Sequence, residues 1–268
     1  MFKTPLKALL LGSALLATSF ASNAQNMHDS WNVLLNNHVV AINHGHSTEV
    51  DYSAIKAKHS ELKTYLDSLS AVTQNEFDEW SKHKQLAFLI NAYNAFTVEL
   101  ILTKYPSLKS IKDLGSFFSS PWSKEFVPLL GKTRSLDDIE HGLIRSSGKY
   151  NDPRIHFAVN CASIGCPALR EEAYTESKLE SQLHHQTDRF LSDMTRNMAH
   201  DNTLSVSSIF KWYGDDFEQG FRGANSLQQF FSQYADELKL IPAQQKALEN
   251  DDMKIKFLDY NWDLNARQ

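Results

Sequence analysis

The segment from Gln85 to Tyr105 constrains the fold more than any other part of this chain. It contains no proline or glycine, it is apolar on nearly every side of a helix, and it ends directly before Pro106. A helix that is hydrophobic all round is a buried helix, so we expect this segment to form the central rod of the core. Two amides, those of Asn91 and Asn94, lie three residues apart on it. Because a buried amide without a partner is costly, both must be hydrogen-bonded inside the fold.

An export signal is indicated at the N-terminus. Lys3 and Lys7 form a short positive region, residues 8–21 are small or apolar, and residues 22–24 supply the small side chains that signal peptidase requires. We therefore predict cleavage after Ala24. An uncleaved membrane anchor is the alternative, but the apolar run is shorter than the roughly 20 residues that span a bilayer.

Residues 25–268, which follow the predicted signal peptide (1–24), are expected to fold as a single globular domain. Cleavage leaves 244 of the 268 residues, and no linker or internal repeat divides them. The net charge changes from −5 to −7 with the loss of the two lysines of the signal, and no cluster of Lys and Arg offers a footprint for nucleic acid or anionic lipid. We therefore expect a soluble periplasmic or secreted protein that binds no nucleic acid and is not inserted in a membrane after cleavage.

Patterns of apolar residues predict the fold class. The first half is mostly helical, and the later half adds strands. Ser135 is an expected N-cap, with Asp138 three residues later, for a helix that ends at about Arg145. The strands are expected at 154–160, 203–209 and 254–260, and a short helix is expected to begin at Pro167. The sequence thus predicts an α+β fold, a helix-rich single domain with a small and mostly antiparallel sheet.

Four segments in this order resemble one known family, the bacterial domain of unknown function 547, of which this chain resembles an exported member. They are residues 86–95 (LAFLINAYNA), 135–145 (SLDDIEHGLIR), 152–167 (DPRIHFAVNCASIGCP) and 208–217 (SIFKWYGDDF). The resemblance implies no activity, because the family is defined without one.

The only two cysteines, Cys161 and Cys166, allow two interpretations. In an oxidising compartment a pair this close is expected to form a disulfide. Alternatively, Cys161 ends the predicted 154–160 strand and acts as a catalytic thiolate. Cys166 is the second candidate nucleophile, because a helix beginning at Pro167 would lower its pKa. Cys161 is preferred because it lies at the centre of the motif.

Histidines near these cysteines are candidate bases for such a thiolate. His141 lies on the polar face of the predicted 135–145 helix, and His156 lies on one face of the predicted strand. Glu140 falls at the edge of the apolar stripe, so we expect it to be partly buried and paired with Arg145 or Arg154. The alternative is that each histidine is a surface group or a hydrogen-bonded structural group without a catalytic role.

An amide could orient the catalytic histidine. Asn91 or Asn94 would do so in a Cys–His–Asn site, with backbone amides of residues 162–166 as the oxyanion hole. The alternative is that both asparagines bind backbone carbonyls of the long 107–134 connection. The segment 212–217, with two carboxylates beside aromatic rings, is either the floor of a site for a cationic or sugar ligand or a turn packed on the core.

Two functional hypotheses follow from these residues. The first is a thiol-dependent hydrolase or transferase acting on an amide, peptide or thioester bond, with Cys161 as the nucleophile and His141 or His156 as the base. The second is a non-enzymatic periplasmic binding or interaction module, in which Cys161 and Cys166 form a structural disulfide. Its partner would be a small molecule or peptide. No motif predicts a cofactor, and the spacing of the histidines in 44–46 and 184–185 does not favour a metal.

Overall fold

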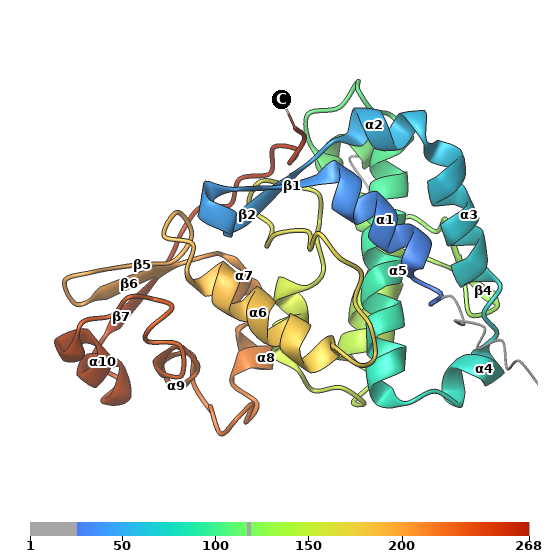
Figure 1. The fold of residues 1–268 in the computed structure, drawn as a ribbon. Helices are drawn as coiled ribbons and strands as arrows, with labels where there is room; N and C mark the ends of the chain where they lie inside the picture. The colour runs from blue at the N-terminus through green and yellow to red at the C-terminus, as the bar shows by residue number, and fades with distance from the viewer. Residues whose placement is uncertain (1–25, 117–118, 268) are drawn as a thin grey trace, which may run out of the picture.

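The fold is α+β and rich in helix, as predicted (Figure 1). The computed structural model describes residues 26–116 and 119–267. The predicted signal peptide, residues 1–24, lies outside the described residues.

Helix α5 (Lys82–Leu102) forms the central rod that its sequence predicts. Ser81 caps it by accepting a hydrogen bond from the amide of Lys84. Among the described residues it is the one helix long and apolar enough to cross a membrane, but 94% of its most apolar window is buried inside the fold. It is therefore a core helix. Between residue 26 and α5 the structure describes four further α-helices, and Figure 1 shows them gathered around it: α1 (Asp29–His38), α2 (Tyr52–Ala57), α3 (His59–Ser70) and α4 (Gln74–Asp78).

In the part of the chain that the structure describes, the strands form three small sheets. Two of these are antiparallel pairs, β1 (Val39–Ile42) with β2 (Ser47–Val50), joined by the turn η1 (Asn43–Gly45), and β3 (Val127–Leu129) with β4 (Lys132–Arg134). The third has the order β5 (Met198–His200), β6 (Thr203–Val206), β7 (Lys254–Phe257). Its β5–β6 pair is antiparallel and its β6–β7 pair is parallel. The expectation of small, mostly antiparallel sheets is confirmed.

The second half of the chain packs around its own aromatic core. The rings that touch there come from distant segments and are almost fully buried: Phe157, Phe190, Phe210, Phe217, Phe230 and Phe231. The helices that carry or cover them are α6 (Leu179–Leu191), α7 (Ile209–Trp212), α8 (Gly214–Phe217), α9 (Leu227–Ser232) and α10 (Pro242–Glu249).

The predicted strand at 154–160 is wrong. Residues Pro153–Phe157 instead form a short 3-10 helix, η5, which Asp152 caps by accepting a hydrogen bond from the amide of Arg154. Every residue from 153 to 160 is buried, so the alternation of apolar and polar residues does not separate a core face from a solvent face. Periodicity cannot distinguish a short buried strand from a short buried helix, and here a proline at the first helical position favours the helix.

The helix predicted at 135–145 is present, and its start is confirmed. The amide of Ser135 donates to the Asp138 carboxylate (2.8 Å), and the amide of Asp138 donates to Oγ of Ser135 (3.0 Å). Most of this helix, η4 (Asp138–Arg145), has the wider π form, which is frequent at functional sites. No helix begins at Pro167, so the helix-dipole argument for Cys166 does not apply.

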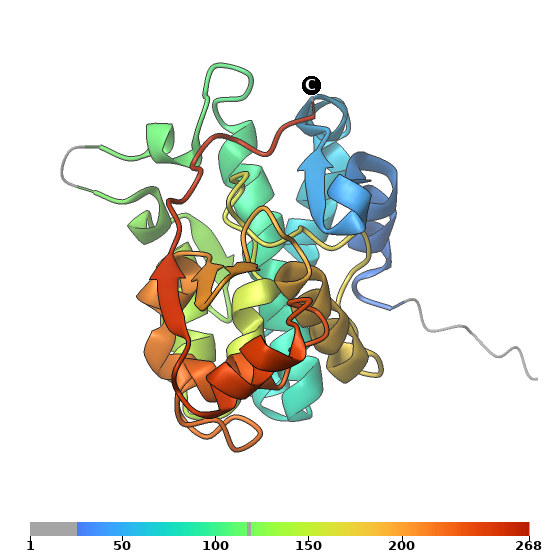
Figure 2. The same cartoon turned by 90° about the vertical axis from the view of Figure 1, so that its left-hand side faces the viewer.

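The segment 258–267 runs as a strap away from β7 and across the molecule (Figure 2). Its carbonyls at Asn261 and Asp263 accept hydrogen bonds from the amides of Gly165 and Ile164, both at 2.8 Å. Gly165 is needed there, because a Cβ at that position would lie 2.8 Å from the Tyr260 ring. The strap therefore holds the loop of the two cysteines and brings aromatic side chains beside it.

Candidate functional site

A cleft of about 280 Å³ lies where η4, η5, α7, the cysteine loop and the strap meet. Its lining divides into an aromatic part and a polar part. The aromatic residues are Tyr93, Trp122, Trp212, Tyr213, Tyr260 and Trp262. The residues that carry acid–base or sulfur chemistry are Asp137, Glu140, His141, His156 and Cys161.

The aromatic wall is assembled from three distant segments of the chain. Trp212 at the end of α7 stacks on Trp262 of the strap, with ring centroids 5.7 Å apart and planes within 26°. Trp122 of η3 (Pro121–Ser123) packs edge-on against the same indole, and Tyr260 contacts it at 4.5 Å. Trp212 remains 46% exposed. Trp212 is thus exposed at the cleft, where the floor of a ligand site would require it. Phe217 of the same motif is packed in the core, as the interpretation of this segment as a packed turn predicts.

His156 is held by an ion-paired carboxylate. Its Nε2 lies 2.7 Å from Oδ2 of Asp216, which also accepts from Nε of Arg145 at 2.6 Å. Burial lowers the pKa of His156 despite the neighbouring carboxylates, so the ring is neutral near pH 7. A neutral ring that donates from Nε2 to Asp216 keeps Nδ1 as an acceptor. The hydrogen bonds from His156 and Arg145 outweigh burial and hold the pKa of Asp216 well below its ordinary value.

The other predicted base, His141, has different partners. Its Nδ1 lies 2.9 Å from Nη1 of Arg145, and its Nε2 lies 3.7 Å from Asp137. Burial raises the pKa of Asp137, against the opposing effect of His141. Arg145 therefore lies between the two histidines and contacts both His141 and the carboxylate that holds His156.

Glu140 is buried, as predicted, but its predicted pairing with Arg145 or Arg154 is wrong. Arg154 is bound by Asp152 and Glu180 instead. The carboxylate of Glu140 faces two phenols, and burial together with this carboxylate raises the pKa of Tyr93 and Tyr213. Glu140 and His141 are adjacent in η4 and both line the cleft, Glu140 as a buried side chain and His141 as a partly exposed one.

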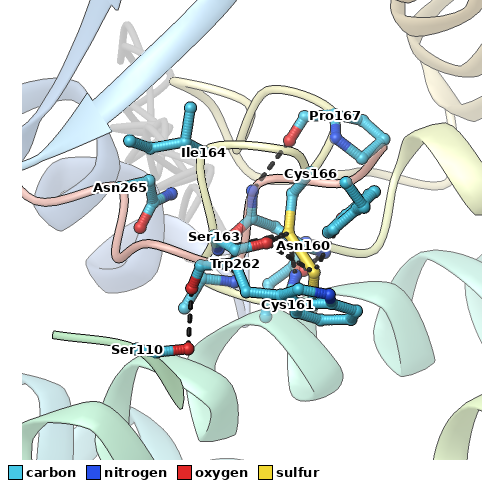
Figure 3. Close-up of a disulfide and its surroundings, with 12 residues drawn as sticks. Ser110, Asn160, Cys161, Ser163, Ile164, Cys166, Pro167, Trp262 and Asn265 are labelled. Carbon is cyan, nitrogen blue, oxygen red and sulfur yellow. Dashed lines mark hydrogen bonds between the residues drawn. A yellow bond between two sulfur atoms is a disulfide. The ribbon is translucent and has the colours of Figure 1, made fainter. Parts of the chain in front are cut away.

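Cys161 and Cys166 form a disulfide, with their Cα atoms 6.0 Å apart (Figure 3). The expectation of a bridge is confirmed. Cys161 lines the cleft, whereas Cys166 is 2% exposed and lies behind it. Asn160 stabilises the loop by donating to the carbonyl of Pro167 and accepting from the amide of Ala162.

The backbone amides of residues 162–166 do not form the predicted oxyanion hole. Each of these amides already has an acceptor: an Asn160 oxygen, the Cys166 sulfur, the carbonyls of Asp263 and Asn261, and the carbonyl of Ser163. An oxyanion hole requires donors that point at the reacting oxygen. The amide donors of residues 162–166 instead form the hydrogen bonds that hold the loop in its own conformation.

The two core asparagines bind backbone, and neither contacts a histidine. Asn91 accepts from the amide of Tyr174 and donates to its carbonyl, at 3.0 and 2.8 Å. Asn94 accepts from the amide of Asn160 and donates to the carbonyl of Ala158, at 2.8 and 2.9 Å. The prediction that both asparagines bind backbone groups is confirmed. The prediction that these groups lie in the 107–134 connection is wrong. They fasten the backbone on both sides of the disulfide to α5.

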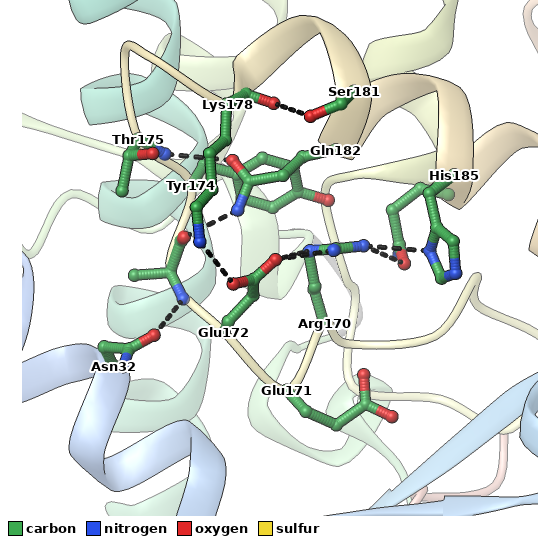
Figure 4. A network of polar contacts seen from close by, with 12 residues as sticks. Asn32, Arg170, Glu171, Glu172, Tyr174, Thr175, Lys178, Ser181, Gln182 and His185 are labelled. Carbon is green, nitrogen blue, oxygen red and sulfur yellow. Dashed lines mark hydrogen bonds and ion pairs between the residues drawn. The ribbon is translucent and has the colours of Figure 1, made fainter.

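The segment that follows the cysteine loop is fixed by further side chains (Figure 4). Asn32 accepts from the amide of Ala173, and Gln182 accepts from the amide of Thr175 while donating to the carbonyl of Ala173. Side chains of α1, α5 and α6 thus bind a segment that has no regular structure of its own.

The cleft brings together four of the residues that the sequence singled out, Cys161, His141, His156 and Glu140, and leaves out Asn91 and Asn94. Asp216, the carboxylate that holds His156, was not predicted in that role, although its segment was noted. Within residues 26–116 and 119–267, no group of three or more His, Cys, Asp or Glu side chains is arranged to hold a metal ion.

Comparison with known families matches residues 77–191 to the family described as "Protein of unknown function, DUF547". No curated protein and no solved structure matches the chain. The matched span includes α5, the capped helix at 135–145 and the disulfide loop, three of the four segments on which the resemblance rests. The resemblance is confirmed over residues 77–191, which match the DUF547 family.

Proposed function

We propose that this protein binds a small ligand in the aromatic cleft and that it works as a soluble protein outside the cytoplasm. The observation that carries the binding proposal is the convergence of six aromatic and five acid–base or sulfur side chains on one cleft of about 280 Å³. Concave sites of this kind, mostly apolar with a few converging polar groups, are the usual form of small-molecule sites. The export part of the proposal is supported by the signal-like residues 1–24 and by the disulfide.

The charge of the cleft limits the class of ligand. Asp137 and Glu140 line it, and no lysine or arginine is among the described lining residues. A negatively charged ligand would therefore lose its hydration without gaining an ion pair. Exposed indole faces such as that of Trp212 bind the apolar face of a sugar ring or an organic cation. The ligand is thus neutral or cationic and carries a flat or rounded apolar face.

Binding is tested with three small probes and one wall variant. Tetramethylammonium, a methyl glycoside and acetate are each titrated while tryptophan fluorescence and Tm are followed. The cation or the glycoside is expected to raise Tm and change the fluorescence, and acetate is expected to do neither. Trp212→Ala should abolish the response. Ile241→Ala, which shortens an exposed side chain outside the cleft, is the matched control. A response to acetate alone, or one that survives Trp212→Ala, contradicts the proposal.

A thiol-dependent hydrolase or transferase for an amide, peptide or thioester bond is the second candidate. It is supported by Cys161 and His156 lining one cleft, with Asp216 in the orienting role. It requires reduction of the bridge by thiols, after which Cys161 attacks the carbonyl carbon and His156 takes up the thiol proton. The amine or thiol of the substrate then leaves with that proton, and water, or the acceptor of a transferase, releases the acyl group from Cys161. Reduced protein should then hydrolyse a simple thioester, whereas oxidised protein and the Cys161→Ser variant should not. Equal rates for all three contradict this candidate.

A further inference from the structure

The two sulfurs of the bridge have unlike surroundings. Cys161 lies at the cleft wall, where an incoming molecule can reach it, and Cys166 is 2% exposed and is not part of the lining. An attacking thiolate must reach the sulfur that it attacks, so access alone favours Cys161.

The hydrogen-bond donors around the bridge are also unevenly divided. Sγ of Cys166 accepts from two backbone amides, those of Cys161 (3.0 Å) and Ser163 (3.3 Å). Sγ of Cys161 receives no backbone donor among the described residues, and its nearest hydrogen-bond donor is the Tyr260 hydroxyl at 3.2 Å. The Ser163 hydroxyl is shared, at 3.2 Å from Cys166 and 3.4 Å from Cys161. Hydrogen bonds to a sulfur stabilise its thiolate, so the loop is arranged to hold a negative charge on Cys166.

We propose that the Cys161–Cys166 bridge is a site of thiol–disulfide exchange, in which a small thiol attacks Cys161 and Cys166 departs as the leaving group. The thiolate of the small molecule forms a new S–S bond with Sγ of Cys161. The Cys161–Cys166 bond breaks, and its electron pair stays on Cys166, where the two amides hold the thiolate. A second thiol then attacks the mixed disulfide and releases the small-molecule disulfide. Two thiols are oxidised, and the protein disulfide is reduced to a dithiol.

The cleft also selects the charge of the thiol. Asp137 and Glu140 lie in the same lining as Cys161, so a cationic or neutral thiol approaches more easily than an anionic one. At equal thiolate concentration, cysteamine and 2-mercaptoethanol are expected to react faster than mercaptopropionate. This activity does not depend on the ligand proposed above, because it needs only access to Cys161.

The experiment determines which sulfur takes up the thiol. Folded, oxidised protein is exposed briefly to 2-mercaptoethanol, quenched with iodoacetamide and mapped by peptide mass. The expected product carries mercaptoethanol on Cys161 and carbamidomethyl on Cys166, in about tenfold or greater excess over the reverse product, because a hydrogen bond to a charged group is worth about that factor. The same reaction in guanidinium, where the loop is unfolded, should show no preference.

Two further measurements make the result decisive. In Tyr260→Phe the phenol that donates to Sγ of Cys161 and makes no hydrogen bond to Cys166 is removed, so the preference for adducts at Cys161 should stay the same or rise. Ser110→Ala removes a neighbouring hydroxyl that binds the carbonyl of Trp262 and not a sulfur, and it should leave the ratio unchanged. Adducts mainly on Cys166, an even division in the folded protein, or a bridge that reacts only when unfolded would each overturn the proposal.

Discussion

Replacing Asp216 by asparagine should destabilise the protein by about 2–3 kcal/mol at pH 7. The carboxylate accepts three hydrogen bonds, two from Arg145 at 2.6 and 3.1 Å and one from His156 at 2.7 Å. Hydrogen bonds to charged groups contribute roughly 1.5–3 kcal/mol each, but an asparagine keeps one acceptor oxygen. Because Asp216 is 23% exposed, water also replaces part of the loss. The acceptor oxygen that asparagine keeps and the access of water together reduce the expected loss of stability to about 2–3 kcal/mol.

The neighbouring Asp215→Asn change is a matched control. Asp215 lies in the same first turn of α8 and loses the same charge, but it is exposed. It should cost about 0.5 kcal/mol or less, as surface substitutions usually do. The free energy of unfolding is measured in urea by far-UV circular dichroism, with tryptophan fluorescence as a second probe. If Asp216→Asn costs no more than Asp215→Asn, the ion pair does not hold His156 in place, and the argument for an oriented base fails.

Three further predictions concern stability and share this assay. Asn94→Leu leaves two buried backbone groups unpaired and should cost about 2–4 kcal/mol, whereas Asn36→Leu, which removes an exposed hydrogen bond, should cost under about 1 kcal/mol. Burial lowers the pKa of His28 from 6.5 to about 4, so its contribution is fully present above pH 6.5 and is lost as the pH falls to 4. The stability advantage of wild type over His28→Gln should therefore shrink by on the order of 3 kcal/mol across that window, and a pH-independent difference would contradict the assignment. Replacing Cys161 and Cys166 together by serine should cost about 2 kcal/mol, as loop entropy gives for a separation of five residues, and a cost near zero would show that the bridge adds no stability.

Local features of the fold could be predicted from the sequence where one physical effect dominates. The all-round apolar surface of Gln85–Tyr105 and the reciprocal cap of Ser135 and Asp138 are such cases. The segment 154–160 is not, because it is buried on every side and its alternation carries no information about a surface. There, the cap that Asp152 provides to the amide of Arg154, together with Pro153 at the first helical position, favours a short helix over the strand that the pattern predicts.

The candidate site was only half predictable, because its remaining parts depend on tertiary contacts. Cys161 and His156 lie five residues apart and were found together. Asp216 reaches His156 from 60 residues away, and Tyr260 reaches Cys161 from 99 residues away. Nothing in the local pattern of either segment indicates these contacts. The two asparagines were predicted to be bonded because burial requires it, but burial does not specify the partner.

The long reach of the strap sets an order of events during synthesis. The cysteines are separated by five positions, so their loop can close as soon as that short stretch has left the ribosome. The Tyr260 ring that covers Gly165 follows 99 residues after Cys161, which at about 5–20 residues per second is a delay of roughly 5–20 seconds. During that interval the growing chain contains both cysteines but not yet the strap residues that complete the aromatic wall. The short loop of the cysteines therefore does not need the strap in order to close, whereas the aromatic cleft is complete only when residues 258–267 have joined the fold.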